Sequence, residues 1–146
     1  MIRIISLFSV LMVAATFSAA CDESFAGPSP NPTSAAQVTD GVWTLQSFQR
    51  ADSTLVSVPN PDRFTIEISA DGRVAVRADC NRCSASYSQA SDGLLVNPLM
   101  ACTKAFCSTA PFDTEYAAAL SDAKLVRTGN NTLQSVSKNG VLTFTR

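Results

Sequence analysis

Four of the five cysteines lie in two short segments, and these residues have the types and spacing that could do chemistry. The first segment is ADCNRCSASYS, residues 78–88, and the second is ACTKAFC, residues 101–107. A CxxC pair together with a CxxxxC pair could bind zinc, act as a thiol–disulfide redox pair, or form structural disulfides. The compartment in which the protein resides decides among these three chemistries.

Residues 1–20 have the pattern of a secretory signal peptide. Arg3 precedes an apolar run over residues 4–17, and small residues lead up to Cys21. The run is shorter than the ~20 residues that a membrane-spanning helix needs, so we expect cleavage and not a retained anchor. The sequence SAAC resembles a bacterial lipoprotein signal, although Ser18 stands where leucine is usual. Ordinary signal peptidase cleavage after the same small residues is the alternative.

The number of cysteines favours lipidation of Cys21. Five cysteines in an oxidising compartment leave one unpaired, whereas four can pair if Cys21 carries acyl chains such as palmitate. Residues 21–38 then form a Pro- and Ser-rich tether, which holds too few large apolar residues to fold by itself. We therefore predict a protein of the bacterial cell envelope, attached to a membrane through this lipid. A secreted or periplasmic soluble protein is the alternative.

Residues 39–146 are predicted to form one globular domain. The chain has 11 basic and 12 acidic residues and a net charge of −1, and no basic patch is visible, so we expect no nucleic-acid binding. It has no histidine, which removes the commonest general base and the commonest transition-metal ligand. We predict no catalytic residues, no bound metal and no cofactor, and we expect a monomer.

The apolar pattern in most of this domain alternates with the period of a β-strand. Residues 63–69 and 73–79 each place their large apolar side chains on one face, and residues 42–49 read as an opening strand. Turn signals at residues 70–72, 91–93 and 138–140 predict three hairpins.

Residues 111–123 have a helical pattern instead. Phe112, Tyr116 and Leu120 recur every four residues, and Pro111 suits the first helical position. Asp113 lies in the first turn, where the helix dipole favours a carboxylate. The predicted fold class is therefore α+β, a curved, mainly antiparallel β-sheet or partly open barrel with one packed α-helix.

The predicted elements bear on the choice of cysteine chemistry. A thioredoxin-like CxxC needs a helix N-terminus, whereas this CxxC follows one strand and precedes another. The CxxxxC spacing fits zinc poorly, and exported small domains more often use such cysteines as disulfides. Bridges between the two clusters would close loops of about 20 to 28 residues and stabilise by roughly 3–4 kcal/mol each. We predict two structural disulfides, and a redox protein using Cys80 and Cys83 is the alternative.

Several motifs then occur in the order found in a known family. They are W-x-L at Trp43, CNR at residues 80–82, S-x-S-Y at residues 84–87, the C-T-x-x-x-C of residues 102–107, and a closing L-T-F. This arrangement resembles the META domain, also called HslJ-like, a family of small bacterial envelope proteins that are often lipoproteins. Ala85 departs from the pattern, since many members have glycine there. The resemblance implies a compact α+β fold with one helix, and it does not imply an enzyme.

The resemblance also implies a cysteine pairing. Cys80 and Cys107 match the two cysteines of members that have only one pair, and Cys83 with Cys102 would then be a nested second pair. The crossed pairing, Cys80 with Cys102 and Cys83 with Cys107, is the alternative.

The polar residues of the motif have structural interpretations. Asn81 is expected to fix the turn after its strand, since asparagine tolerates left-handed backbone and bonds nearby amides. Arg82 is expected to be solvated or paired with a carboxylate, with an anion ligand as the alternative, and Thr103 to bond backbone between the two cysteine clusters. We predict a non-catalytic envelope lipoprotein domain that binds an unidentified envelope protein or stabilises an envelope assembly, in a role linked to stress.

Overall fold

The computed structural model describes residues 38–39 and 41–146. The predicted signal peptide, Cys21 and residues 22–37 of the tether lie outside the described residues. Val38, the last residue of the predicted tether, is fully buried, and its carbonyl accepts a hydrogen bond from Trp43 Nε1 at 3.0 Å. None of the helices in the described part of the chain is long and apolar enough to span a membrane.

The described domain is built around a 10-stranded antiparallel sheet and the helix α2. In chain order the elements are β1 (Val42–Arg50), β2 (Leu55–Val56), the 3-10 turn η1 (Pro61–Arg63), β3 (Phe64–Ser69), β4 (Arg73–Ala78), β5 (Asn81–Ala90), β6 (Gly93–Val96), β7 (Ala101–Cys102), α2 (Phe112–Leu120), β8 (Lys124–Gly129), β9 (Thr132–Ser137) and β10 (Gly140–Thr145).

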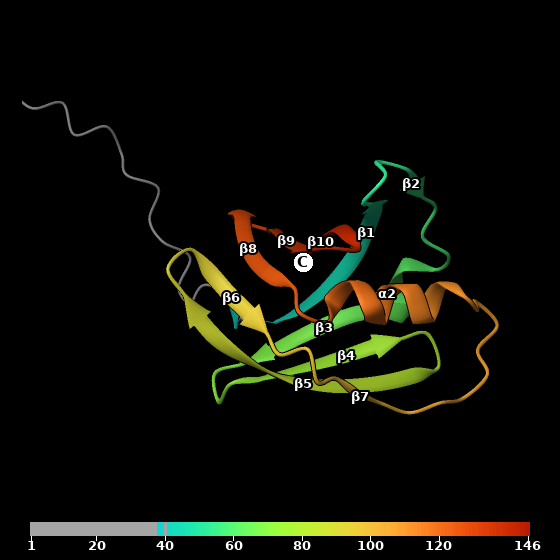
Figure 1. The fold of residues 1–146 in the computed structure, drawn as a ribbon, viewed down its shortest axis with the longest axis horizontal. Coiled ribbons are helices and arrows are strands. Elements are labelled where there is room, and N and C mark those ends of the chain that lie inside the picture. The colour runs from blue at the N-terminus through green and yellow to red at the C-terminus, as the bar shows by residue number, and fades with distance from the viewer. Residues whose placement is uncertain (1–37, 40) are drawn as a thin grey trace, which may run out of the picture.

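The sheet closes on itself as a barrel. Its strands follow the order β10-β9-β8-β6-β5-β4-β3-β1, and β1 pairs again with β10, so eight strands form a ring (Figure 1). The short strands β2 and β7 are not part of this ring, and they pair with β1 and β5, respectively. The predicted curved antiparallel sheet with a packed helix is confirmed. The sheet curves far enough to close into a barrel.

Strand β1 makes this closure possible because it serves two neighbours. Its first residues pair with β3, and its residues from Thr44 to Arg50 pair with β10, with an irregularity between Leu45 and Ser47. Gly140 begins β10 with a φ of +134°, and a Cβ atom there would lie 2.1 Å from the Gln49 carbonyl oxygen. Only glycine allows the two backbones to approach this closely.

The apolar residues of the alternating pattern point into the barrel, and the residues between them point outward. Val74, Val76 and Ala78 of β4 are buried, whereas Arg73, Ala75 and Arg77 between them are exposed. Strand β3 likewise buries Phe64, Ile66 and Ile68. The predicted faces and all three predicted hairpins are confirmed.

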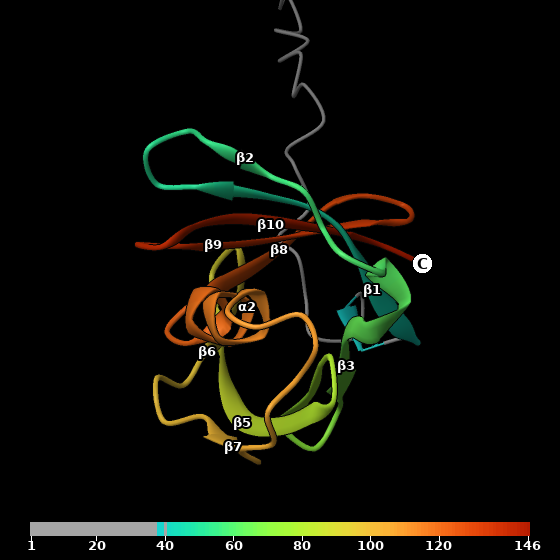
Figure 2. The ribbon, with the colours of Figure 1, turned by 90° about the vertical axis from the view of Figure 1, so that its right-hand side faces the viewer.

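Helix α2 packs against β4 on one side and against β9 and β10 on the other, and Figure 2 shows it between β9 and β5. Its aromatic stripe is buried as predicted, and the Tyr116 ring lies edge-on to Phe64 with 5.3 Å between ring centroids. The helix is shorter than the predicted 111–123, since Pro111 occupies the N-cap position and Asp122 turns the chain with a φ of +59°. The chain then enters β8, which the sequence pattern did not predict.

Candidate functional site

The two cysteine clusters meet at the turn between β4 and β5. The structure joins Cys80 to Cys107, with 5.6 Å between their Cα atoms, and Cys83 to Cys102, with 4.0 Å. Cys83 and Cys102 are direct cross-strand partners on β5 and β7. The bridges therefore nest one within the other, and the crossed pairing does not occur in this structure.

Together the bridges fasten a loop that we call the strap, residues 98–107. Within the strap, Cys107 is buried and Cys102 is exposed, and on β4–β5 Cys80 is exposed and Cys83 is buried. Cys80 and Cys83 are each bonded to the strap and not to each other. A local CxxC disulfide, which a thioredoxin-like reaction requires, is thus not the arrangement that this fold presents.

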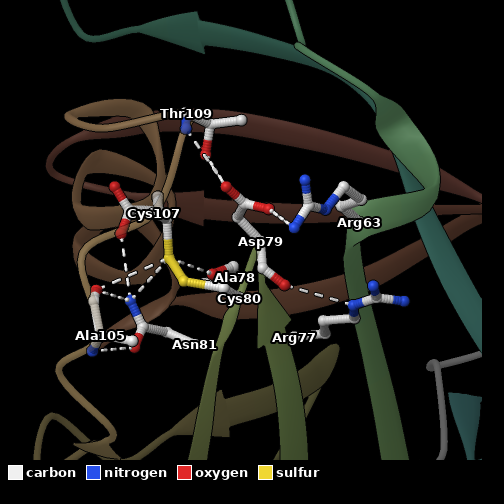
Figure 3. A network of polar contacts seen from close by, with 10 residues as sticks. Arg63, Arg77, Ala78, Asp79, Cys80, Asn81, Ala105, Cys107 and Thr109 are labelled. Atoms are coloured by element: carbon white, nitrogen blue, oxygen red, sulfur yellow. Dashed lines mark hydrogen bonds and ion pairs between the residues drawn. A yellow bond between two sulfur atoms is a disulfide. The ribbon is translucent and has the colours of Figure 1, made fainter.

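Asn81 connects the strap to the barrel through its side-chain amide. Its Oδ1 accepts hydrogen bonds from Ala105 N at 2.8 Å and from the Thr103 hydroxyl at 3.0 Å. Its Nδ2 donates to Ala105 O at 3.0 Å and lies 3.1 Å from Cys107 Sγ and 3.2 Å from Asp113 Oδ2 (Figure 3). The predicted left-handed backbone at Asn81 is wrong, because Asn81 is the first residue of β5, whereas the predicted bond from its side chain to an amide is present, to Ala105 N of the strap.

The left-handed residue of this turn is Asp79, with a φ of +58°. Its carboxylate is buried, and it accepts hydrogen bonds from the Thr109 hydroxyl at 2.6 Å and the Thr109 amide at 3.2 Å. Arg63 pairs with the other oxygen at 2.5 Å (Figure 3). The hydroxyl bond from Thr109, with the amide bond and Arg63 adding to it, lowers the pKa of the Asp79 carboxyl below its usual value despite burial.

Thr103 and Arg82 bond the strap to β5 through the backbone. The Thr103 hydroxyl accepts a hydrogen bond from Arg82 N at 3.0 Å, and Thr103 N donates to Arg82 O at 3.0 Å. The Arg82 side chain is exposed and pairs with no carboxylate of the described residues. The Thr103 hydroxyl is fully engaged, with no base among its partners that could make it a nucleophile.

A cavity of about 370 Å³ lies between the strap, the start of β5 and helix α2. Its polar residues include Asn81 and Asp113, and the Cys83–Cys102 bridge forms part of its wall. Asp113 is buried, and its Oδ1 has no hydrogen-bond partner among the described residues. Phe106 of the strap also lines this cavity and is 97% exposed.

The two acidic residues of α2 have separate partners. Asp113 contacts Asn81, whereas Glu115 forms a two-pronged ion pair with Arg50 of β1, at 3.0 and 2.8 Å. The two carboxylates therefore have different partners on different strands. Within residues 38–39 and 41–146, no group of three or more His, Cys, Asp or Glu side chains could hold a metal ion.

Sequence reasoning missed two features of this site. The alternating pattern of residues 73–79 predicted Asp79 to be the last residue of a strand. The signal that could have indicated a turn is the residue type, since aspartate tolerates left-handed backbone. The exposure of Phe106 was not predicted, because a single aromatic residue between two cysteines belongs to no periodic pattern from which its burial could be inferred.

Residues 36–146 match the META domain, and the chain belongs to this family. No curated protein matches the chain.

The fold is similar to those of solved structures. The NMR structure of a protein from Burkholderia xenovorans has 24% sequence identity and a TM-score of 0.59, over 82% of this chain and 92% of that one. The crystal structure of a DUF4847 family protein from Bacteroides vulgatus has 17% identity and a TM-score of 0.51, over 74% and 93% of the two chains. At these identities the similarity concerns the fold alone.

Proposed function

We propose that this META domain is a non-catalytic module of the bacterial cell envelope, lipid-anchored through Cys21, that binds another envelope protein through its strap. The observation that carries this proposal is the combination of rigidity and exposure in the strap. Phe106 is 97% and Leu99 is 84% exposed, on a loop that two disulfides and the Asn81 amide hold in place.

An exposed apolar side chain costs little to immobilise at an interface when its backbone is already fixed. The cavity next to Phe106 adds a concave surface that a partner side chain could fill. The Thr103 and Thr109 hydroxyls are already engaged, by the Asn81 amide and the Asp79 carboxylate, which supports a structural role for these groups.

Capture of the lipidated protein from its native envelope, after mild crosslinking, tests the proposal. We expect one specific partner to be recovered with the wild-type chain and to be lost with Phe106→Ser. Leu55→Ser is the matched control, because Leu55 is 73% exposed on β2, and both ribbon views place β2 on the opposite side of the barrel from β7 (Figures 1 and 2). Equal recovery from all three proteins would contradict a partner site on the strap.

The redox alternative makes a different prediction. If Cys80 and Cys83 exchange disulfides, mild reduction should produce a low-pKa thiol that reacts before the domain unfolds. Under our proposal, thiols become reactive only with unfolding. Titration of the thiols with an alkylating reagent, alongside circular dichroism, distinguishes the two.

A further inference from the structure

Two arginines stand directly opposite each other on the outer face of the barrel. Arg77 of β4 and Arg82 of β5 are cross-strand partners, and both side chains are exposed. Like charges in this relationship repel and destabilise a sheet. The repulsion between Arg77 and Arg82 therefore has to be compensated by another interaction.

The backbone places these two side chains at their closest. Arg82 N and Arg82 O are both bonded to Thr103, so both groups point toward the strap and away from β4. Arg77 and Arg82 are therefore a non-hydrogen-bonded pair, whose Cβ atoms in antiparallel sheets lie about 4.5–5.5 Å apart.

No carboxylate of the described residues neutralises this pair. Arg77 uses its Nε to donate to Asp79 O at 3.3 Å, which leaves its terminal nitrogens free. Arg63, drawn beside Arg77 in Figure 3, already pairs with Asp79. Glu67 of β3 lies opposite Ala75 and makes no ion pair with either arginine.

A shallow cavity of about 380 Å³ adjoins Arg82 on the strap side of β5, and Arg77, on the β4 side, does not line it. Ser84 lines it, points to the same exposed face as Arg82, and its hydroxyl has no hydrogen-bond partner among the described residues. We propose that Arg77 and Arg82, with the Ser84 hydroxyl, bind a phosphate group. Planar guanidinium groups match the oxygens of a phosphate, and an anion between them turns repulsion into attraction.

The phosphate could be the diester of a phospholipid headgroup or the monoester of a soluble molecule. The first source rests on the proposed membrane anchor, whereas the site itself does not. Phe106→Ser should leave phosphate binding unchanged, so failure of the partner site and failure of the phosphate site can be told apart.

Titration of the purified protein with inorganic phosphate and with glycerophosphoglycerol, at constant ionic strength, tests this site. We expect saturable NMR shifts of amides in β4 and β5, and at least a tenfold weaker affinity for Arg77→Ser and for Arg82→Ser. Arg73→Ser is the matched control, since Arg73 lies on the same face of β4 but is paired with Asp71. Its affinity should equal that of the wild type.

Arg82→Glu separates binding from folding. It places opposite charges across from each other, so the protein should unfold at the same or a higher temperature while phosphate binding is lost. Tighter binding of the diester would identify a lipid headgroup as the ligand, and tighter binding of inorganic phosphate a soluble monoester. Shifts that do not saturate, or that weaken equally in Arg73→Ser, would overturn the proposal.

Discussion

Asp79 derives its role from residues far away in the sequence. Its neighbours Ala78 and Cys80 lie in a tight turn, but its carboxylate is satisfied by Arg63 and Thr109. A buried carboxylate is tolerated only when charge and hydrogen bonds compensate its lost hydration. The side chain thereby ties η1 and the segment that leads into α2 to the end of β4.

Asp79→Asn should destabilise the domain by about 1–3 kcal/mol at neutral pH. Asparagine tolerates the left-handed backbone, so the substitution isolates the charge. Because the folded pKa of Asp79 lies below its unfolded value, its contribution is fully present above about pH 4 and is lost as pH falls through the folded pKa.

Urea denaturation between pH 2 and pH 7 measures this dependence. The wild type should lose stability more steeply than Asp79→Asn as the pH falls below 4. Asp71→Asn serves as the control. The pKa of Asp71 is also lowered by its hydrogen bond from Arg73, but solvent screens this exposed pair, so the change in acid sensitivity should be much smaller than for Asp79→Asn. Parallel curves for wild type and Asp79→Asn would show that the buried carboxylate does not contribute.

At the scale of elements, the pairing of β1 with β10 closes the barrel, and the strap is a separate loop fastened to β5 and to the β4–β5 turn. Closure of the barrel depends on the close approach of two backbones at Gly140, and attachment of the strap depends on the two disulfides. Each can be disrupted without touching the other.

Gly140→Ala should destabilise the domain by ~3 kcal/mol or more, because the new Cβ meets the Gln49 carbonyl and the adjacent Arg50 backbone. Gly72→Ala is the control for the cost of a positive φ alone. Gly72 has a φ of +89°, and a Cβ there meets nothing closer than 4.0 Å, so we expect a loss of only ~1 kcal/mol. Equal losses in thermal denaturation would show that the close approach at closure is not limiting.

Replacing Cys83 and Cys102 by serine together should cost ~2 kcal/mol. The bridge alone closes a loop with a sequence separation of 19, but the outer Cys80–Cys107 bridge still holds the two clusters together in the unfolded chain. Removal of both bridges should cost about 5 kcal/mol. Peptide mapping of the unreduced wild type checks the pairing, and a peptide linked only within residues 78–88 would contradict it.

At the scale of the whole molecule, the two proposed binding sites lie close to each other on the barrel. The strap, the cavity beneath it and the Arg77–Arg82 pair all lie around the β4–β5 turn.

Cys21→Ser should release the protein from the membrane fraction or stall its processing. The prediction follows because lipid on Cys21 is the proposed anchor, and serine cannot carry the thioether. Fractionation and the intact mass of the mature chain are the measurements. A wild-type mass without acyl chains, together with unchanged partitioning of the variant, would rule out the lipoprotein.

The sequence alone determined the features that depend on neighbours along the chain. Alternation set the inner and outer faces of β3 and β4, turn residues placed three hairpins, and the spacing of Phe112, Tyr116 and Leu120 marked the helix. These signals are local, because side-chain direction and turn geometry repeat with the backbone. The family resemblance added the pairing of the cysteines.

Only the tertiary structure decided what depends on partners far apart in the sequence. Barrel closure requires β1 to meet β10, and strand β8 is defined by its neighbours β6 and β9 more than by its own weak pattern. Asn81 became a bridge to the strap, and Arg82 came to face Arg77, through pairings that neither residue's local sequence encodes. The physical reason is that burial, hydrogen bonding and repulsion depend on which residues are neighbours in space, and the tertiary structure determines those neighbours.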